Sequence, residues 1–122
     1  MVNSRKIRNR ALFCDLLNLP RGKYLPKDVA ASGKVGFARG AFAVSFDRDL
    51  LPVPGCGFYD GLPDMELVLD EGRRKSWQPN TEIALGDLQV DDEPFGLCAR
   101  SQLRRTIGEW EDLGLFPMVG LE

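Results

Sequence analysis

Apolar residues take alternate positions in several short segments of this chain, which is the spacing of β-strands. Met65, Leu67 and Leu69 lie at every second position, so residues 65–69 are a predicted half-buried strand. Apolar composition predicts further strands at residues 11–17, 21–25, 41–46, 83–88 and 116–121. The first two are expected to form a hairpin, because Pro20 between them cannot continue a strand interior.

A second spacing, of three to four residues, predicts a helix over about residues 102–113. Its apolar residues form one stripe: Leu103, Ile107, Trp110 and Leu113. Ser101 is the expected N-cap, and Gly114 stands where a left-handed residue often ends a helix. We interpret the stripe as the face that packs on the core.

Two other segments complete the pattern. A short helix over residues 27–32 is expected to end at Gly33. Residues 47–63 contain several prolines and glycines and predict a long loop, and loops above roughly 12–15 residues are usually functional or disordered. Short strands with one well-defined late helix predict an α+β fold.

Composition narrows the class of protein. A chain of 122 residues is expected to form a single domain, residues 1–122. The net charge of −2 gives no argument for a nucleic-acid or membrane partner, and neither a signal sequence nor an apolar run of about 20 residues is present. We therefore expect a cytoplasmic protein.

The available chemistry is limited by the residue types that the sequence lacks. It contains no histidine, which excludes Ser-His or Cys-His catalysis and imidazole metal ligands within the chain. It also has no glycine-rich phosphate-binding motif. Its three cysteines are far apart and are interpreted as ordinary thiols. Any catalysis would rest on carboxylates, lysine, arginine or tyrosine.

A series of short motifs, in a fixed order, resembles the N-terminal domain of the glutamine synthetase family. These motifs are Asp15–Lys23, Pro63–Asp70, Ser76–Pro79, Ala99–Leu103 and Val119–Glu122. The spacing is more similar to the gamma-glutamylpolyamine synthetase-like branch than to housekeeping glutamine synthetase. Phe46-Asp47-Arg48-Asp49 stands where the housekeeping enzymes carry F-D-G-S-S.

The resemblance implies a β-grasp-like mixed sheet of about five to six short strands with one main helix near the C-terminus. It implies an ATP-dependent ligase that joins a glutamate-type carboxylate to ammonia or an amine through an acyl-phosphate. Such enzymes are homo-oligomers, typically dodecamers of stacked hexameric rings. The catalytic domain is expected to follow residue 122, so this chain would be inactive alone and would have its own catalytic domain and neighbouring subunits as partners.

The resemblance also implies site residues. The long loop of the family's N-terminal domain covers the ammonium side of the neighbouring subunit's site, and Asp64 and Asp47 are the candidates to contribute there. Glu122 matches a family metal ligand, which implies Mg²⁺ or Mn²⁺ together with ATP in the full-length protein, and no cofactor held by this chain.

Physical chemistry is compatible with that role for the loop. A buried ammonium needs carboxylates, and aromatic rings both exclude water and contact cations. The loop supplies both kinds of group: Asp47, Asp49, Phe58, Tyr59, Asp60 and Asp64. The alternative is that these aspartates are solvated residues with roles in turns.

Other polar and aromatic residues are more simply explained by structure. Arg21 and Lys23 are compatible with a phosphate site, but a structural or subunit-contact role is favoured. Arg100 is expected to pair with a carboxylate, and Trp77 to be a packing anchor. The alternative function for the whole chain is a free-standing β-grasp module that binds other proteins.

Overall fold

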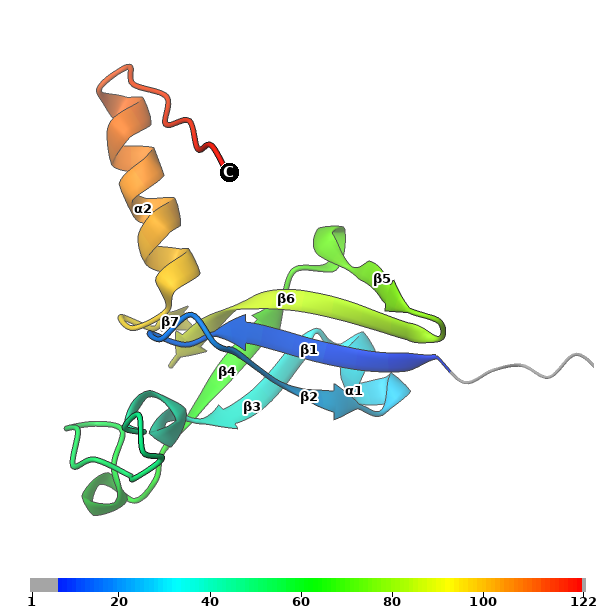
Figure 1. Cartoon of the computed structure of the whole chain (residues 1–122), viewed down its shortest axis with the longest axis vertical. Helices are drawn as coiled ribbons and strands as arrows, with labels where there is room; N and C mark the ends of the chain where they lie inside the picture. Colours follow the sequence, from blue (N-terminus) through cyan, green and yellow to red (C-terminus); the bar gives the residue numbers. More distant parts are fainter. Residues whose placement is uncertain (1–6, 122) are drawn as a thin grey trace, which may run out of the picture.

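The computed structural model describes residues 7–121, except for the side chain of Arg73. Seven strands and two α-helices occur in this range, with three short 3₁₀ turns between them (Figure 1). The strands are β1 (Arg8–Cys14), β2 (Pro20–Leu25), β3 (Lys34–Ala38), β4 (Asp64–Leu69), β5 (Lys75–Gln78), β6 (Thr81–Val90) and β7 (Glu93–Pro94). The helices are α1 (Lys27–Ser32) and α2 (Ala99–Asp112). The predicted α+β class, a mixed sheet with one main helix near the C-terminus, is confirmed.

Strand β6 organises the sheet, whose order is β2-β1-β6-β4-β3. Residues 81–85 of β6 pair with β1 in a parallel arrangement, and residues 86–89 pair with β4 in an antiparallel arrangement. The change of partner falls at Gly86, where a Cβ atom would overlap the Val68 carbonyl and lie 2.8 Å from Leu67 Cδ1. Strands β5 and β7 pair with the two ends of β6. Figure 1 shows β3 and β4 running obliquely to β1 and β6.

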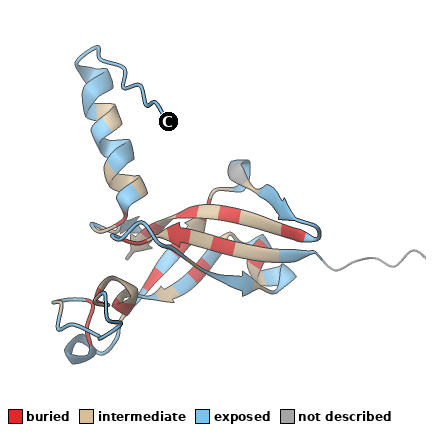
Figure 2. Ribbon diagram, in the orientation of Figure 1, coloured by how far each residue is buried: buried red, intermediate tan, exposed pale blue. Residues whose placement is uncertain are grey.

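Most of the buried residues lie on the strands, where Figure 2 colours them red. Met65, Leu67 and Leu69 are all buried, so the alternation predicted for β4 is confirmed. Phe13 of β1 packs against Phe37, with ring centroids 5.0 Å apart and the rings nearly perpendicular. The buried cluster as a whole consists of Ala11, Phe13, Val35, Met65, Leu67, Leu69, Ala84, Leu88 and Cys98.

Two of the strand predictions are wrong. Residues 41–46 are not a strand: the segment begins in a 3₁₀ turn (Arg39–Phe42), from which Phe42 packs on the core. The strand of this region is β3, which lies before residues 41–46. Left-handed Gly33 (φ 73°) ends α1 as predicted, and β3 begins at the next residue. Residues 116–121 are irregular and exposed.

Helix α2 differs most from its prediction. It begins at Ala99 with Cys98 as N-cap, so Ser101 lies inside the first turn. None of its residues is buried, and Leu103 is 62% exposed, so the apolar stripe is not a core face within the described chain. The physical reason is visible in Figure 1, where α2 projects away from the sheet. Trp77, predicted to anchor packing, is likewise 62% exposed on β5. No helix among residues 7–121 is long and apolar enough to cross a membrane.

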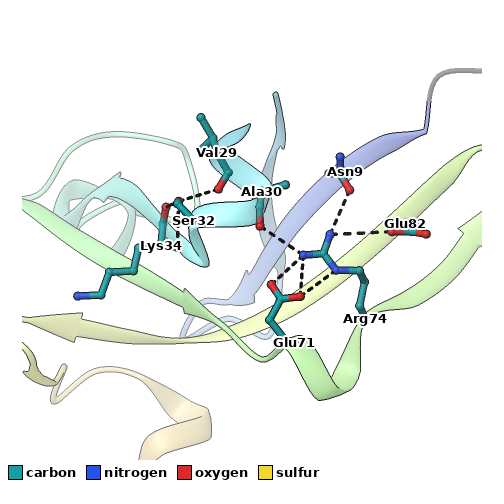
Figure 3. A network of polar contacts seen from close by, with 8 residues as sticks. All are labelled: Asn9, Val29, Ala30, Ser32, Lys34, Glu71, Arg74 and Glu82. Carbon is teal, nitrogen blue, oxygen red and sulfur yellow. Dashed lines mark hydrogen bonds and ion pairs between the residues drawn. The ribbon is translucent and has the colours of Figure 1, made fainter. Parts of the chain in front are cut away.

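A polar network around Arg74, absent from the sequence predictions, joins several elements (Figure 3). The Arg74 guanidinium donates to Asn9 Oδ1 in β1 at 3.1 Å and to the Ala30 carbonyl in α1 at 3.3 Å. It also pairs with Glu71 at 2.8 Å and approaches Glu82 of β6 at 3.9 Å. One side chain therefore ties the short helix to the sheet.

Replacing this side chain is expected to destabilise the fold. Arg74→Leu leaves the Ala30 carbonyl and Asn9 without their donor and should lower the free energy of unfolding by about 1–2 kcal/mol in urea titrations. Arg105→Leu is the control, since Arg105 is highly exposed and only approaches Glu109 at 3.6 Å. It should change stability by less than about 0.5 kcal/mol. Equal effects of the two substitutions would contradict the structural role of Arg74.

Candidate functional site

The first half of the long loop is an ordered hairpin rather than open coil. The Leu51 amide donates to the Ala43 carbonyl at 2.6 Å, and the Ser45 amide donates to the Asp49 carbonyl at 2.8 Å. We call this segment the 43–51 hairpin. Asp47 is exposed in its tight end turn, which the Ser45 and Asp49 contacts close.

The second half of the loop is also folded. A 3₁₀ turn spans Phe58–Asp60 and ends at left-handed Gly61 (φ 79°). Asp60 Oδ2 accepts a hydrogen bond from the Gly57 amide at 3.1 Å, and Cys56 beside it is buried. For Asp60, the structure therefore supports the alternative interpretation, a role in the turn.

An apolar groove lies between these two halves of the loop. It has a volume of ≈ 200 Å³ and is lined by Leu50, Leu51, Pro52, Phe58 and Tyr59. Phe58 is 70% exposed and Tyr59 is 90% exposed, and their rings meet edge to face with centroids 6.2 Å apart. The loop thus exposes an aromatic pair to solvent.

A second groove, which is polar and has a volume of ≈ 400 Å³, lies beside β4. Asp64 lines it from the first position of β4, and the Asp64 carbonyl accepts a hydrogen bond from Arg39 Nε at 2.8 Å. Lys34 bridges Glu66 and Asp92 of the same groove at 3.0 Å each, and these carboxylates raise the pKa of Lys34. The structure therefore places the two predicted site residues on different segments, Asp64 in this groove and Asp47 on the hairpin.

The described residues do not offer a metal site. Glu122, the predicted metal ligand, lies outside them, and residues 7–121 contain no group of three or more acidic or cysteine side chains suited to an ion. The Mg²⁺ or Mn²⁺ that the resemblance implies for the full-length protein therefore stays a prediction.

Arg21 belongs to a clamp that holds the tip of the β1–β2 hairpin. Its Nε donates to Asp15 Oδ2 at 2.7 Å, while the Leu17 and Leu19 amides donate to Asp15 Oδ1 at 2.9 Å each. Lys23 lies over the Phe37 ring at 4.4 Å and also reaches the Gly36 carbonyl. The structural role expected for these two cations is confirmed.

Asp15 makes the clamp sensitive to pH. Burial alone raises the pKa of Asp15, but the Leu19 amide, the Arg21 guanidinium and the Leu17 amide outweigh it and hold that pKa below the ordinary 3.8. A lowered folded-state pKa contributes stability that is present above pH 3.8 and is lost as the pH falls through the folded value.

Asp15→Asn should therefore lower the free energy of unfolding at pH 7 by about 1–2 kcal/mol, since a charged acceptor is lost from Arg21. The difference in unfolding free energy between wild type and Asp15→Asn should shrink as the pH falls below 3.8, because the unfolded chain then binds a proton that the folded carboxylate releases. Urea titrations at pH 7 and at about pH 3 compare the two values. The control, Asp112→Asn, removes an exposed charge at the end of α2. Its difference in unfolding free energy from wild type should not depend on pH in this way. An equal loss of unfolding free energy in Asp15→Asn at both pH values would contradict the stabilising role of the Asp15 carboxylate.

Helix α2 is fixed to the sheet at its first turns. Arg100 pairs with Asp87 of β6 at 3.0 Å and with Asp70 at 3.6 Å, and Arg104 also contacts Asp87. The Arg100 contact is an ion pair rather than an aligned hydrogen bond, because Asp87 Oδ1 has no hydrogen-bond partner among the described residues. The prediction that Arg100 pairs with a carboxylate is confirmed.

No protein-family model and no curated protein matches the sequence. Solved structures do match. The ligand-free structure of GmaS has a TM-score of 0.67 and 20% identity, over 88% of this chain and 24% of that chain. A GmaS/ADP complex has a TM-score of 0.67 and 19% identity, over 89% of this chain and 24% of that chain. A novel glutamine synthase homolog has a TM-score of 0.69 and 20% identity, over 88% of this chain and 27% of that chain.

These likenesses show the fold alone: the chain has the fold of one domain of the GmaS structures and of the glutamine synthase homolog. It spans about a quarter of the length of the structures that it matches.

Proposed function

We propose that this chain is the N-terminal domain of an ATP-dependent ligase of the glutamine synthetase type. The ligase joins a glutamate-type carboxylate to ammonia or an amine, and the domain is inactive alone. Its roles are subunit assembly and completion of the neighbouring subunit's active site. The observation that carries the proposal is the folded segment of residues 43–62, which consists of the 43–51 hairpin and the turn that ends at Gly61. It exposes Phe58 and Tyr59 to solvent beside the hairpin that carries Asp47.

The chemistry assigns a simple task to the loop. The substrate carboxylate takes the terminal phosphoryl group of ATP, which leaves an acyl-phosphate and ADP. The bound ammonium first loses one proton, which frees the lone pair of the nitrogen. The neutral amine nitrogen then forms a bond to the acyl carbon, the carbon–oxygen bond to phosphate breaks, and the nitrogen loses a second proton. Asp47 holds the ammonium from the 43–51 hairpin and favours its approach. Asp64 contributes its carboxylate from the separate groove beside β4. On this proposal, ATP and its metal bind outside the described residues.

Assembly accounts for the other exposed apolar surfaces. Large apolar side chains of α2 and of the segment after Gly114 are exposed to solvent: Leu103, Leu113, Phe116, Met118 and Val119. An apolar surface of this kind marks an interface. On this proposal the catalytic domain and adjoining subunits cover it, in a cytoplasmic dodecamer built from head-to-tail rings.

The resemblance to the gamma-glutamylpolyamine synthetase-like branch favours an organic amine as acceptor over ammonia. The same exposed apolar surfaces support a second candidate, a free-standing β-grasp module that binds other proteins. The length of the gene distinguishes the two candidates, because the ligase requires a catalytic domain after this one and the module does not.

The test uses the complete gene product. Phosphate release and amide formation are measured with ATP, glutamate and either ammonium or an amine, and light scattering gives the assembly size. The proposal expects amide formation by a large homo-oligomer. A complete product that lacks a catalytic domain and forms no amide would instead support the interaction module.

A further inference from the structure

We propose that two copies of this chain pair through helix α2, with the two helices antiparallel and related by a two-fold axis near Ile107. The occupant of the apolar face of α2 is then the α2 of a second copy. The inference does not rest on the proposed function, because it concerns the 122-residue chain by itself.

The apolar face of α2 offers both a groove and a large side chain that can fill one. The groove has a volume of ≈ 340 Å³ and is lined by Arg100, Leu103, Arg104 and Ile107. Trp110 lies on the same stripe, about two turns further along the helix, and is 46% exposed. An antiparallel pair centred near Ile107 places position 110 of one helix opposite position 103 of the other. Each copy therefore inserts its Trp110 into the groove of the other copy, where two arginines flank the ring.

The charges of α2 are arranged against the dipole of a lone helix. No acidic residue lies in its first turn and no basic residue in its last. The first half carries the cations Arg100, Arg104 and Arg105, and the second half carries the anions Glu109, Glu111 and Asp112. Anions stabilise the N-terminal end of a helix and cations the C-terminal end, so this order is unfavourable for α2 alone. A second, antiparallel α2 reverses the situation, because each acidic end then lies beside the basic end of the other copy.

Ion pairs within the chain account for only part of this arrangement. Asp87 of β6 binds Arg100 and Arg104, which explains the cations of the first two turns. Among residues 7–121, Arg105 pairs only with Glu109 of its own helix, and Glu111 forms no ion pair. Figure 1 shows α2 projecting from the sheet, so these charges have no neighbouring element to complement. Charge complementarity thus favours a second α2 as the partner.

One charge pair defines the expected register. Arg105 Nε lies 3.6 Å from Glu109 Oε1, so the two side chains share one side of α2. Positions 105 and 109 are symmetrical about position 107. A two-fold axis near Ile107 therefore places Arg105 of each copy opposite Glu109 of the other, and both pairs lie at the rim of the contact.

The first experiment measures the mass of the 122-residue chain by sedimentation equilibrium. Two 14-residue helices bury less than the roughly 1,200 Å² of a stable interface, so the association is weak. We expect monomers at a few micromolar, the range of urea titrations, and a mean mass that approaches two chains at about 500 µM. Leu103→Asn should weaken association by at least about tenfold. Leu16→Asn is the matched control at the tip of the β1–β2 hairpin, since Leu16 is 59% exposed and Leu103 is 62% exposed, and it should have no effect.

The second experiment exchanges the charges. Arg105→Glu and Glu109→Arg each place like charges opposite one another, so each variant alone should associate at least about fivefold more weakly than wild type. An equimolar mixture of the two variants should regain the wild-type association, because both pairs across the axis are again opposite in sign. Circular dichroism verifies that each variant keeps its helix.

Three results would overturn the inference. A wild-type chain that stays monomeric at about 500 µM leaves the face of α2 to another part of the gene product or to another protein. Equal association in wild type and Leu103→Asn, or equal losses in Leu103→Asn and Leu16→Asn, would exclude a specific contact through α2. A mixture of the charge variants that associates no better than each variant alone would exclude the antiparallel pair.

Discussion

Gly86→Ala is expected to lower the free energy of unfolding by about 3 kcal/mol, at the upper end of the usual cost of overpacking. Gly86 lies where β6 changes its partner from β1 to β4. An added Cβ would overlap the Val68 carbonyl oxygen and press on Leu67, one of the fully buried side chains. Backbone in the middle of a sheet has little freedom to move away, so the strain is not relieved.

Gly36→Ala is the matched control, because Gly36 is also a strand glycine but a Cβ there meets open space. Its effect should stay within about 0.5 kcal/mol. Urea unfolding monitored by circular dichroism gives both values. Similar losses for the two variants would mean that the close approach at Gly86 does not set the geometry of the sheet.

If the proposed function holds, Asp47→Asn in the complete gene product is expected to lower kcat/KM for the amine by about 100-fold, because the amide no longer attracts the ammonium or assists loss of its proton. The side chain is exposed on the 43–51 hairpin, so the folded domain should be unchanged. Steady-state kinetics at saturating ATP and glutamate measures the effect.

Asp28→Asn provides the control for loss of one exposed carboxylate. Asp28 lies in α1, which Figure 1 shows at the opposite end of the sheet from the 43–62 segment. Its kcat/KM should stay within about twofold of wild type, as for a surface substitution remote from a site. Unchanged kinetics in Asp47→Asn would remove that residue from the proposed amine site.

Local patterns in the sequence predict the elements whose causes are local. The alternation of Met65, Leu67 and Leu69 correctly indicates β4, and Gly33 correctly marks the end of α1. The stripe of α2 is apolar as predicted, but its assignment to the core is wrong. Periodicity shows that a helix has an apolar face, whereas only the tertiary structure shows whether that face is covered.

Long-range contacts account for the features that the sequence does not predict. Arg74 acts through Asn9, which is 65 positions away in the chain, and no spacing rule relates them. Phe58 and Tyr59 are recognisable from the sequence as candidates to exclude water or contact a cation. The groove that they line is not recognisable from the sequence, because it forms only when the two halves of the loop fold against each other.

The most direct test of the proposed function mixes two variants of the complete gene product in one assembly, each with at most about a hundredth of the wild-type activity. One variant carries Asp47→Asn, and the other has an inactivated catalytic domain with a normal N-terminal domain. If the N-terminal domain completes a neighbour's site, some sites combine two intact halves, and activity should return to about a quarter of wild type in randomly mixed rings. No recovery in verified mixed assemblies would show that the domain does not serve its neighbour, and would contradict the proposed role.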